Sequence, residues 1–154
     1  MANDIAPSTR CWLEGVLTWL GLPDSQRQES IASATLVLRD VVIKFLDPPY
    51  GDRTYLVARA VVGDVPPPGC CEPFFQLVLE VQAMLCGPHT PMLGLDWPDR
   101  KLLVQCSLDI PSLSMEEAAA ILRGMHQMAM EWRQAIAKAD APPSREAVRV
   151  VVSG

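Results

Sequence analysis

Apolar side chains recur every three or four residues in three segments of the chain, a spacing that predicts amphipathic helices. The first segment, residues 9–20, ends at Gly21, a favoured residue just beyond a helix C-terminus. The second covers residues 74–86 and follows a proline suited to a first helical turn. The third follows a capping box of Ser114 and Glu117 and keeps one apolar face for about six turns.

Five further segments are rich in Val, Ile, Leu and Phe, which favours strands: residues 35–39, 41–46, 55–62, 92–96 and 101–108. Arg39 and Asp40 predict a tight turn between the first two of these segments. The polar residues 24–30 predict a loop. The order α-βββ-α-ββ-α, with short connections, predicts an α+β fold in which an antiparallel, twisted sheet packs against helices.

The chain has 154 residues, of which 49% are hydrophobic and 20% charged, so one folded domain is expected. We place this domain at residues 1–138 and a loose tail at 139–154, where residues 148–152 are a candidate edge strand. Fourteen prolines cluster in the connections between elements, consistent with their roles as helix and strand breakers.

The formal net charge of −5 argues against nucleic acid and against an anionic membrane surface as partners. Apolar stretches are too short for a membrane span, and the N-terminal residues do not resemble a signal peptide. Five cysteines without a small-scaffold spacing indicate reduced thiols. These features together predict a cytosolic protein.

Catalytic motifs such as a phosphate-binding loop or a nucleophile elbow are not found, so we do not expect an enzyme. Cys86 and His89, with the adjacent Cys70 and Cys71, are a conceivable zinc site, but a second proper ligand pair is lacking. Glu117 and its acidic neighbour are explained by helix capping. No metal or other cofactor is therefore predicted.

The second predicted helix is apolar nearly all round and must be covered on two sides. Its residues Leu77, Val81 and Met84 are expected to cover the sheet. The remaining face then needs a second copy of the chain, because a two-fold contact is the simplest cover for it. The predicted homodimer interface is Phe75, Val78, Leu79 and Gln82, with Leu102 and Val104 from a neighbouring strand.

Several ordered pieces of the sequence resemble the class I type III secretion chaperones, the Tir-chaperone-like family of Gram-negative bacteria. The pieces are Leu20-Gly21-Leu22-Pro23 after Trp12-Leu13, the third strand running into Val65-Pro66, Phe75-Gln76-Leu77-Val78-Leu79-Glu80, Met92-Leu93-Gly94-Leu95-Asp96, the strand at 101–108 and Glu131-Trp132-Arg133. Ala83 and Pro91 depart from the family pattern.

This resemblance implies a homodimeric, ATP-independent chaperone of the bacterial cytoplasm. It would bind the N-terminal segment of one or more type III effector proteins, keep it extended and deliver it to the secretion apparatus. The secretion ATPase is a further candidate partner. Extended segments gain affinity from main-chain pairing and specificity from side-chain pockets.

The first predicted helix carries more large apolar residues than one core face needs, so part of it is expected to be exposed and to bind the effector. Trp12 and Val16 are the preferred exposed members. The candidate effector-binding residues are Trp12, Leu13, Val16, Leu17, Trp19 and Leu20 of this helix and Leu36, Leu38, Val41 and Ile43 of the first two strands. The alternative that all six helical residues are core stays open.

Two other classes of protein remain as alternatives. One is a small α+β ligand-binding or enzymatic domain with an apolar pocket, which would need convergent polar groups. The other is an adaptor that binds folded proteins. Peptide binding distinguishes the chaperone from the first of these.

Overall fold

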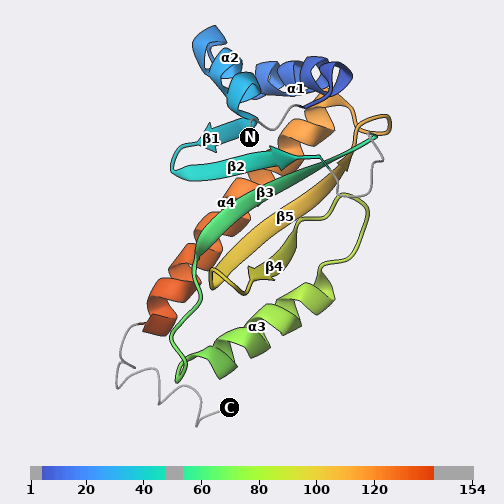
Figure 1. Ribbon diagram of the computed structural model, residues 1–154. Coiled ribbons are helices and arrows are strands. Elements are labelled where there is room, and N and C mark those ends of the chain that lie inside the picture. The colour runs from blue at the N-terminus through green and yellow to red at the C-terminus, as the bar shows by residue number, and fades with distance from the viewer. Residues whose placement is uncertain (1–4, 48–53, 141–154) are drawn as a thin grey trace.

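The computed structural model describes residues 5–47 and 54–140, and these ranges contain four helices and five strands (Figure 1). The helices are α1 (Pro7–Trp19), α2 (Asp24–Ser33), α3 (Cys71–Met84) and α4 (Met115–Asp140). The strands are β1 (Thr35–Leu38), β2 (Val41–Leu46), β3 (Tyr55–Asp64), β4 (Met92–Asp96) and β5 (Lys101–Asp109). The candidate strand at 148–152 lies outside the described residues.

The five strands form one antiparallel sheet in the order β1-β2-β3-β5-β4. The predicted two-residue turn is present, because Leu38 pairs with Val41 and Arg39 takes a left-handed φ of 55°. The sheet is twisted, and the long helix α4 runs across one of its faces (Figure 1). The predicted α+β fold with an antiparallel sheet is therefore confirmed.

Alternating residues of the three central strands build the core beneath α4. Ala58 and Ala60 lie on the middle strand and are fully buried, and their small side chains allow a helix to approach closely. The surrounding buried residues include Val41, Ile43, Phe45, Leu56, Leu102, Val104, Cys106 and Leu108 from the sheet and Ala118, Leu122, Met125, Ala129 and Trp132 from α4. This core holds the sheet in one orientation against α4.

The predicted capping box begins α4. The backbone N–H of Glu117 donates to Ser114 Oγ (3.2 Å), and the backbone N–H of Ser114 donates to Glu117 Oε2 (2.9 Å). The bond from the Ser114 N–H, together with one from the Ser114 hydroxyl to the same Oε2 (2.8 Å), lowers the pKa of the Glu117 carboxyl, since both favour its charged form. The contribution of this carboxylate to stability is therefore present at neutral pH and lost as the pH falls through the lowered pKa.

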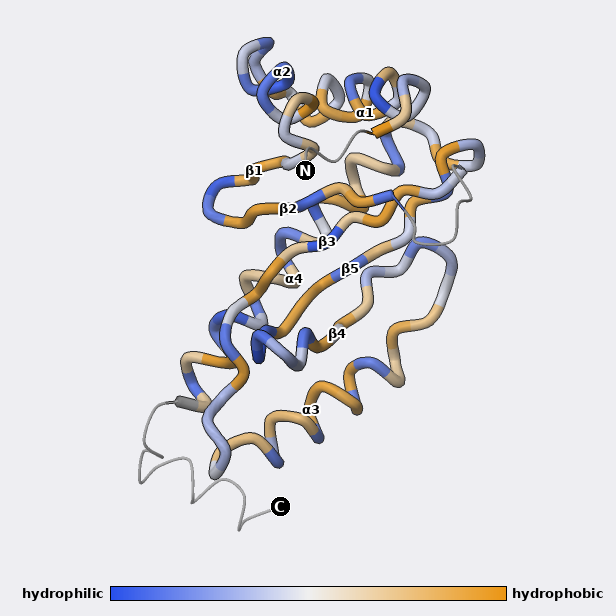
Figure 2. Tube along the Cα trace, viewed as in Figure 1, coloured by the Kyte–Doolittle hydropathy of each residue, from blue (hydrophilic) through white to orange (hydrophobic). Residues whose placement is uncertain are grey.

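The predicted loop at residues 24–30 is wrong, because these residues belong to helix α2. Figure 2 shows α2 as a mainly hydrophilic helix, so it has almost no apolar periodicity to reveal it. It follows Pro23, its first residue Asp24 forms an ion pair with Arg27, and it ends at Ala34 in a left-handed conformation. Its buried residue is Ser30, and the half-buried Ile31 packs against the core, so the helix contacts the neighbouring structure through a narrow face.

The predicted orientation of the second helix is also wrong. Phe74 and Val78 are the buried residues of α3, whereas Leu77 and Met84 are exposed. The reason is that α3 lies along the outer edge of the sheet at β4 rather than across its face (Figure 1). Phe74 packs edge-to-face on Trp132 of α4, with ring centroids 5.8 Å apart.

Arg133 of α4 joins the β1–β2 turn to the bulge in β3. Its Nε donates to Val62 O (2.9 Å), and its guanidinium also contacts Val61 O and the turn residue Asp40. The strand register shifts between Val61 and Gly63, so this irregular stretch of β3 receives its hydrogen bonds from Arg133. A residue that the resemblance singled out thus fixes the position of the first hairpin.

We expect Arg133→Lys to lower the free energy of unfolding by about 2 kcal/mol, because an ammonium group cannot replace the fork of guanidinium donors. Urea unfolding followed by circular dichroism measures this change. The control is Asp40→Asn, which removes an exposed carboxylate and is expected to cost less than about 1 kcal/mol. Equal stability of Arg133→Lys and the unmodified chain would contradict the assigned role.

Candidate functional site

The two edges of the sheet differ in how their backbone groups are satisfied. At β4, the N–H of Leu93 donates to Oε1 of Gln82 on α3 (2.8 Å), so α3 satisfies one of the outward backbone groups of that edge. At β1, the opposite edge, the neighbouring element is α2. The β1 edge is therefore the place where another strand could pair.

The alternation of the β1–β2 ladder identifies which backbone groups face this edge. Phe45 N–H donates to Ala34 O (2.8 Å), so Ala34 directs its backbone groups towards β2. Every second residue along a strand points the same way, and Leu36 and Leu38 therefore also direct their backbone groups towards β2. The N–H and C=O groups of Thr35 and Val37 then point away from the sheet. In the described part of the chain these groups form no hydrogen bond, which leaves them free to pair with an extended peptide.

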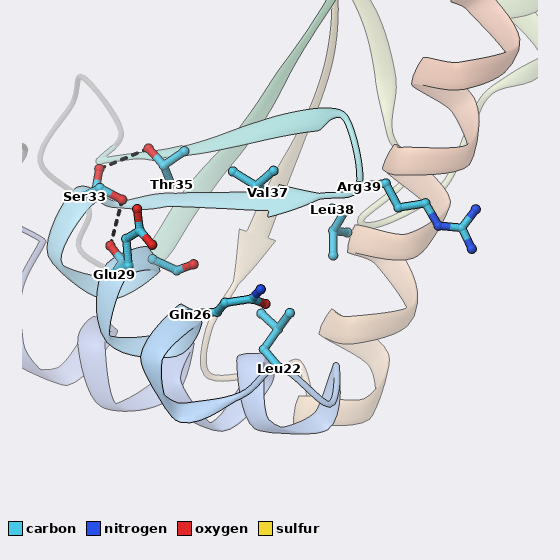
Figure 3. A pocket seen from close by; sticks show the side chains of 9 residues that line it. Leu22, Gln26, Glu29, Ser33, Thr35, Val37, Leu38 and Arg39 are labelled. Atoms are coloured by element: carbon cyan, nitrogen blue, oxygen red, sulfur yellow. Dashed lines mark hydrogen bonds between the residues drawn. The ribbon is translucent and has the colours of Figure 1, made fainter.

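A groove of about 510 Å³ lies between this edge and α2 (Figure 3). Leu22, Val37 and Leu38 supply its apolar lining. Polar side chains line it as well, and they come mainly from α2: Gln26, Glu29, Ser30 and Ser33. The groove thus offers backbone pairing, apolar contacts and hydrogen-bonding side chains to one extended segment.

Most of the candidate effector-binding residues are core. The expectation that Trp12 and Val16 are exposed is wrong, because they are 7% and 0% exposed. The other fully buried candidates are Leu13, Leu17, Leu36, Val41 and Ile43. The alternative that the first helix is mainly a core element therefore holds for four of its six residues, and the physical reason is that α1 packs on both α2 and α4.

The three remaining candidates lie near one another at the surface. Trp19 is 55% exposed, and Leu20 and Leu38 are half-buried. Leu20 and Leu38 line a common hollow beside α4. The groove residues Thr35, Val37 and Gln26 were missed by the sequence analysis, since an alternating strand does not reveal whether it lies at an edge.

The other large apolar surface lies on α3 and β4. Leu79 and Met84 are 69% and 75% exposed and lie on different sides of α3, and Leu77, Met92, Leu95 and Trp97 are exposed as well. Of the predicted homodimer residues, Leu79 belongs to this surface, whereas Phe75 is half-buried and Gln82 is bonded to Leu93. Val78, Leu102 and Val104 are buried within the chain, because they face its own core.

The described residues contain no cluster of three or more His, Cys, Asp or Glu side chains arranged to hold a metal. They also contain no helix long and apolar enough to cross a membrane. Cys106 donates a hydrogen bond to His89 O (3.1 Å), and burial raises the pKa of this thiol to about 11. Cys106 is therefore a neutral thiol at physiological pH.

Solved structures that share this fold include a type III secretion chaperone and a chaperone–effector complex. One chain of the ExsC–ExsE complex matches with a TM-score of 0.62 at 18% sequence identity, over 86% of this chain and 96% of that chain. The Yersinia pestis type III secretion chaperone SycH, solved with a stable fragment of YscM2, matches with a TM-score of 0.60 at 17% identity, over 79% of this chain and 97% of that chain.

A third match is the HopA1–SchA chaperone–effector complex, with a TM-score of 0.57 at 13% identity, over 84% of this chain and 98% of that chain. No protein family and no curated protein match the sequence. At these low identities the likeness concerns the fold. The chain has the fold of the type III secretion chaperones, which confirms the resemblance at the level of architecture.

We expect Cys106 to resist alkylation in the folded protein at pH 8, whereas the exposed Cys11 reacts.

The raised pKa of Cys106 also predicts a pH dependence of stability. The thiol has a pKa of 9.0 in the unfolded chain and about 11 in the folded chain, so the unfolded chain loses this proton at a lower pH. The free energy of unfolding therefore falls as the pH rises from 9.0 to about 11. Mass spectrometry after iodoacetamide treatment measures the first effect, and pH-dependent urea unfolding of the chain and of Cys106→Ala measures the second. Rapid alkylation of Cys106 would contradict this prediction.

Proposed function

We propose that this protein is a type III secretion chaperone of the bacterial cytoplasm, and that it binds the N-terminal segment of one or more effector proteins in an extended, secretion-competent form. The open edge of β1 beside the α2 groove is the observation that carries this proposal. The fold supports it, since the structures that share it include the HopA1–SchA chaperone–effector complex.

In this proposal, the effector segment pairs with the outward backbone groups of Thr35 and Val37. Its side chains lie alternately against the apolar floor at Leu22 and Leu38 and towards solvent. The segment buries its own apolar side chains in this way without folding. Such a bound state suits a chain that must later pass through a narrow channel.

We also propose that the protein acts as a homodimer, and that the exposed surface of α3 and β4 is the contact between copies. Leu79 and Met84 lie on different sides of α3, and a monomer would leave both apolar side chains in water. A dimer would place two β1 edges on one particle, so that a long segment could contact both. Contact with the secretion ATPase remains a prediction from the resemblance alone.

Val37→Pro tests the binding edge. Proline removes the outward N–H of Val37 but no bond of the β1–β2 ladder, so the fold is expected to persist while effector binding falls at least about tenfold. The chain is co-expressed with the tagged products of the genes beside its own, and co-purification and calorimetry with the truncated N-terminal segment measure binding.

The matched control is Val37→Thr, which keeps the N–H and the β-branched shape and should bind normally. Undiminished binding by Val37→Pro would show that the segment binds elsewhere. Absence of any copurifying product would contradict the proposed function itself.

Leu79→Glu tests the dimer. A charge at this exposed position of α3 is expected to convert a particle of twice 16.9 kDa into a folded monomer, because a carboxylate buried in the contact would lack a partner. Sedimentation equilibrium at micromolar concentration measures the mass. Trp19→Glu, at an exposed tryptophan of α1, should remain dimeric. A monomeric mass for the unmodified chain would contradict this part of the proposal.

A further inference from the structure

The groove at β1 continues past the β1–β2 turn into a second hollow, of about 700 Å³, between the end of α1 and α4. Leu38 and Arg39 line both hollows, which makes them neighbouring parts of one surface. Arg39 extends from the turn on the side of α4 (Figure 3). The second hollow, called here the cationic hollow, is lined by Leu20, Leu38, Arg39, Arg123, His126, Gln127 and Met130.

The charge of the cationic hollow opposes that of the whole chain. The chain has a net charge of −5, yet the hollow is lined by two arginines and a histidine and by no Asp or Glu. Of the nearby acidic groups, Asp40 forms an ion pair with Arg133, and Glu131 lies outside the lining and accepts a hydrogen bond from the lining residue Gln127 (3.0 Å). An anionic group would therefore find a local positive potential there.

The cationic side chains also have unused hydrogen-bonding capacity. Within the described residues, neither Arg39 nor Arg123 has a carboxylate partner, and Arg123 donates to Trp19 O (3.3 Å). Nε2 of His126 is buried and has no hydrogen-bond partner. Because this atom is closed to solvent, the donors that the hollow offers to a ligand are those of Arg39 and Arg123.

We propose that the cationic hollow binds the carboxylate of an Asp or Glu side chain in the segment that pairs with β1. This inference rests on the proposed function and adds a specificity rule to it. A segment that leaves the β1 edge at Leu38 must pass the β1–β2 turn, where Arg39 and Arg123 can both bond one carboxylate. The acidic residue thus flanks the paired stretch, and the apolar residues Leu20 and Met130 contact the stem of its side chain.

The test begins with a phage-displayed library of random peptides selected on the immobilised full-length chain. Peptides of about 16 residues are long enough to span both hollows at about 3.3 Å per residue. We expect the selected peptides to share an apolar, β-prone stretch with an acidic residue at a constant distance from one of its ends. Selection on the Arg39→Gln/Arg123→Gln variant should yield the apolar stretch without the acidic residue.

The best acidic peptide is then synthesised together with a copy in which glutamine replaces the acidic residue. We expect the double variant to bind the acidic peptide about tenfold or more weakly than the unmodified chain does, and to bind the glutamine peptide with unchanged affinity. The control variant Arg100→Gln/Lys138→Gln removes the same charge elsewhere and should keep the preference for the acidic peptide. Circular dichroism checks folding. If the double variant is unfolded, Arg39→Gln alone carries the test, because no hydrogen bond of the described chain uses its side chain.

The outcomes separate this inference from the function on which it rests. Two results would overturn the carboxylate site and leave peptide binding intact. One is that the selected peptides share no acidic residue at a constant position. The other is that the double variant loses affinity equally for the acidic peptide and for the glutamine peptide. Selection of no peptide at all would overturn both.

Discussion

An open sheet ends in two edges, and each edge carries backbone groups that must be paired, covered or exposed. In this protein one edge is partly covered from within, since Gln82 on α3 accepts the outward N–H of Leu93. The other edge is the four-residue strand β1, whose outward groups are free. The proposed binding of an extended effector segment uses β1, because the groove between β1 and α2 adds side-chain contacts to these free backbone groups.

The free edge is useful only if it is held rigidly, and α4 does this. Its apolar face packs on the central strands, where Ala58 and Ala60 permit a close approach, and Arg133 bonds the β1–β2 turn and the bulge of β3. A disordered segment loses conformational entropy when it pairs with a strand. A strand that is already ordered adds little to this cost, so the hairpin is a suitable template.

The low identity to structures with the same fold has a physical explanation. An antiparallel sheet under a long helix needs period-two apolar alternation and small residues where the helix crosses it, and many sequences meet those conditions. Surface residues are free to vary under the same constraint. The cationic hollow at Arg39 and Arg123 lies on the surface, and a preference for acidic segments would be a property of these side chains and not of the fold.

The sequence by itself determined the five strands, the capping box at Ser114 and three of the four helices, because each of these depends on local periodicity or on neighbours in the chain. Tertiary structure decided the rest. Helix α2 has a polar sequence, and its place beside β1 depends on contacts that local spacing does not encode.

Local sequence likewise did not determine which apolar residues face the core and which face solvent. Trp12 and Leu79 have similar apolar character, yet Trp12 is buried because α1 has helices on two sides, and Leu79 is exposed because α3 lies at the sheet edge. The free backbone of Val37 follows from β1 being the last strand of the sheet. The order of the strands arises from pairing between segments that are distant in the chain. The sequence of one strand therefore does not show whether that strand lies at the edge of the sheet.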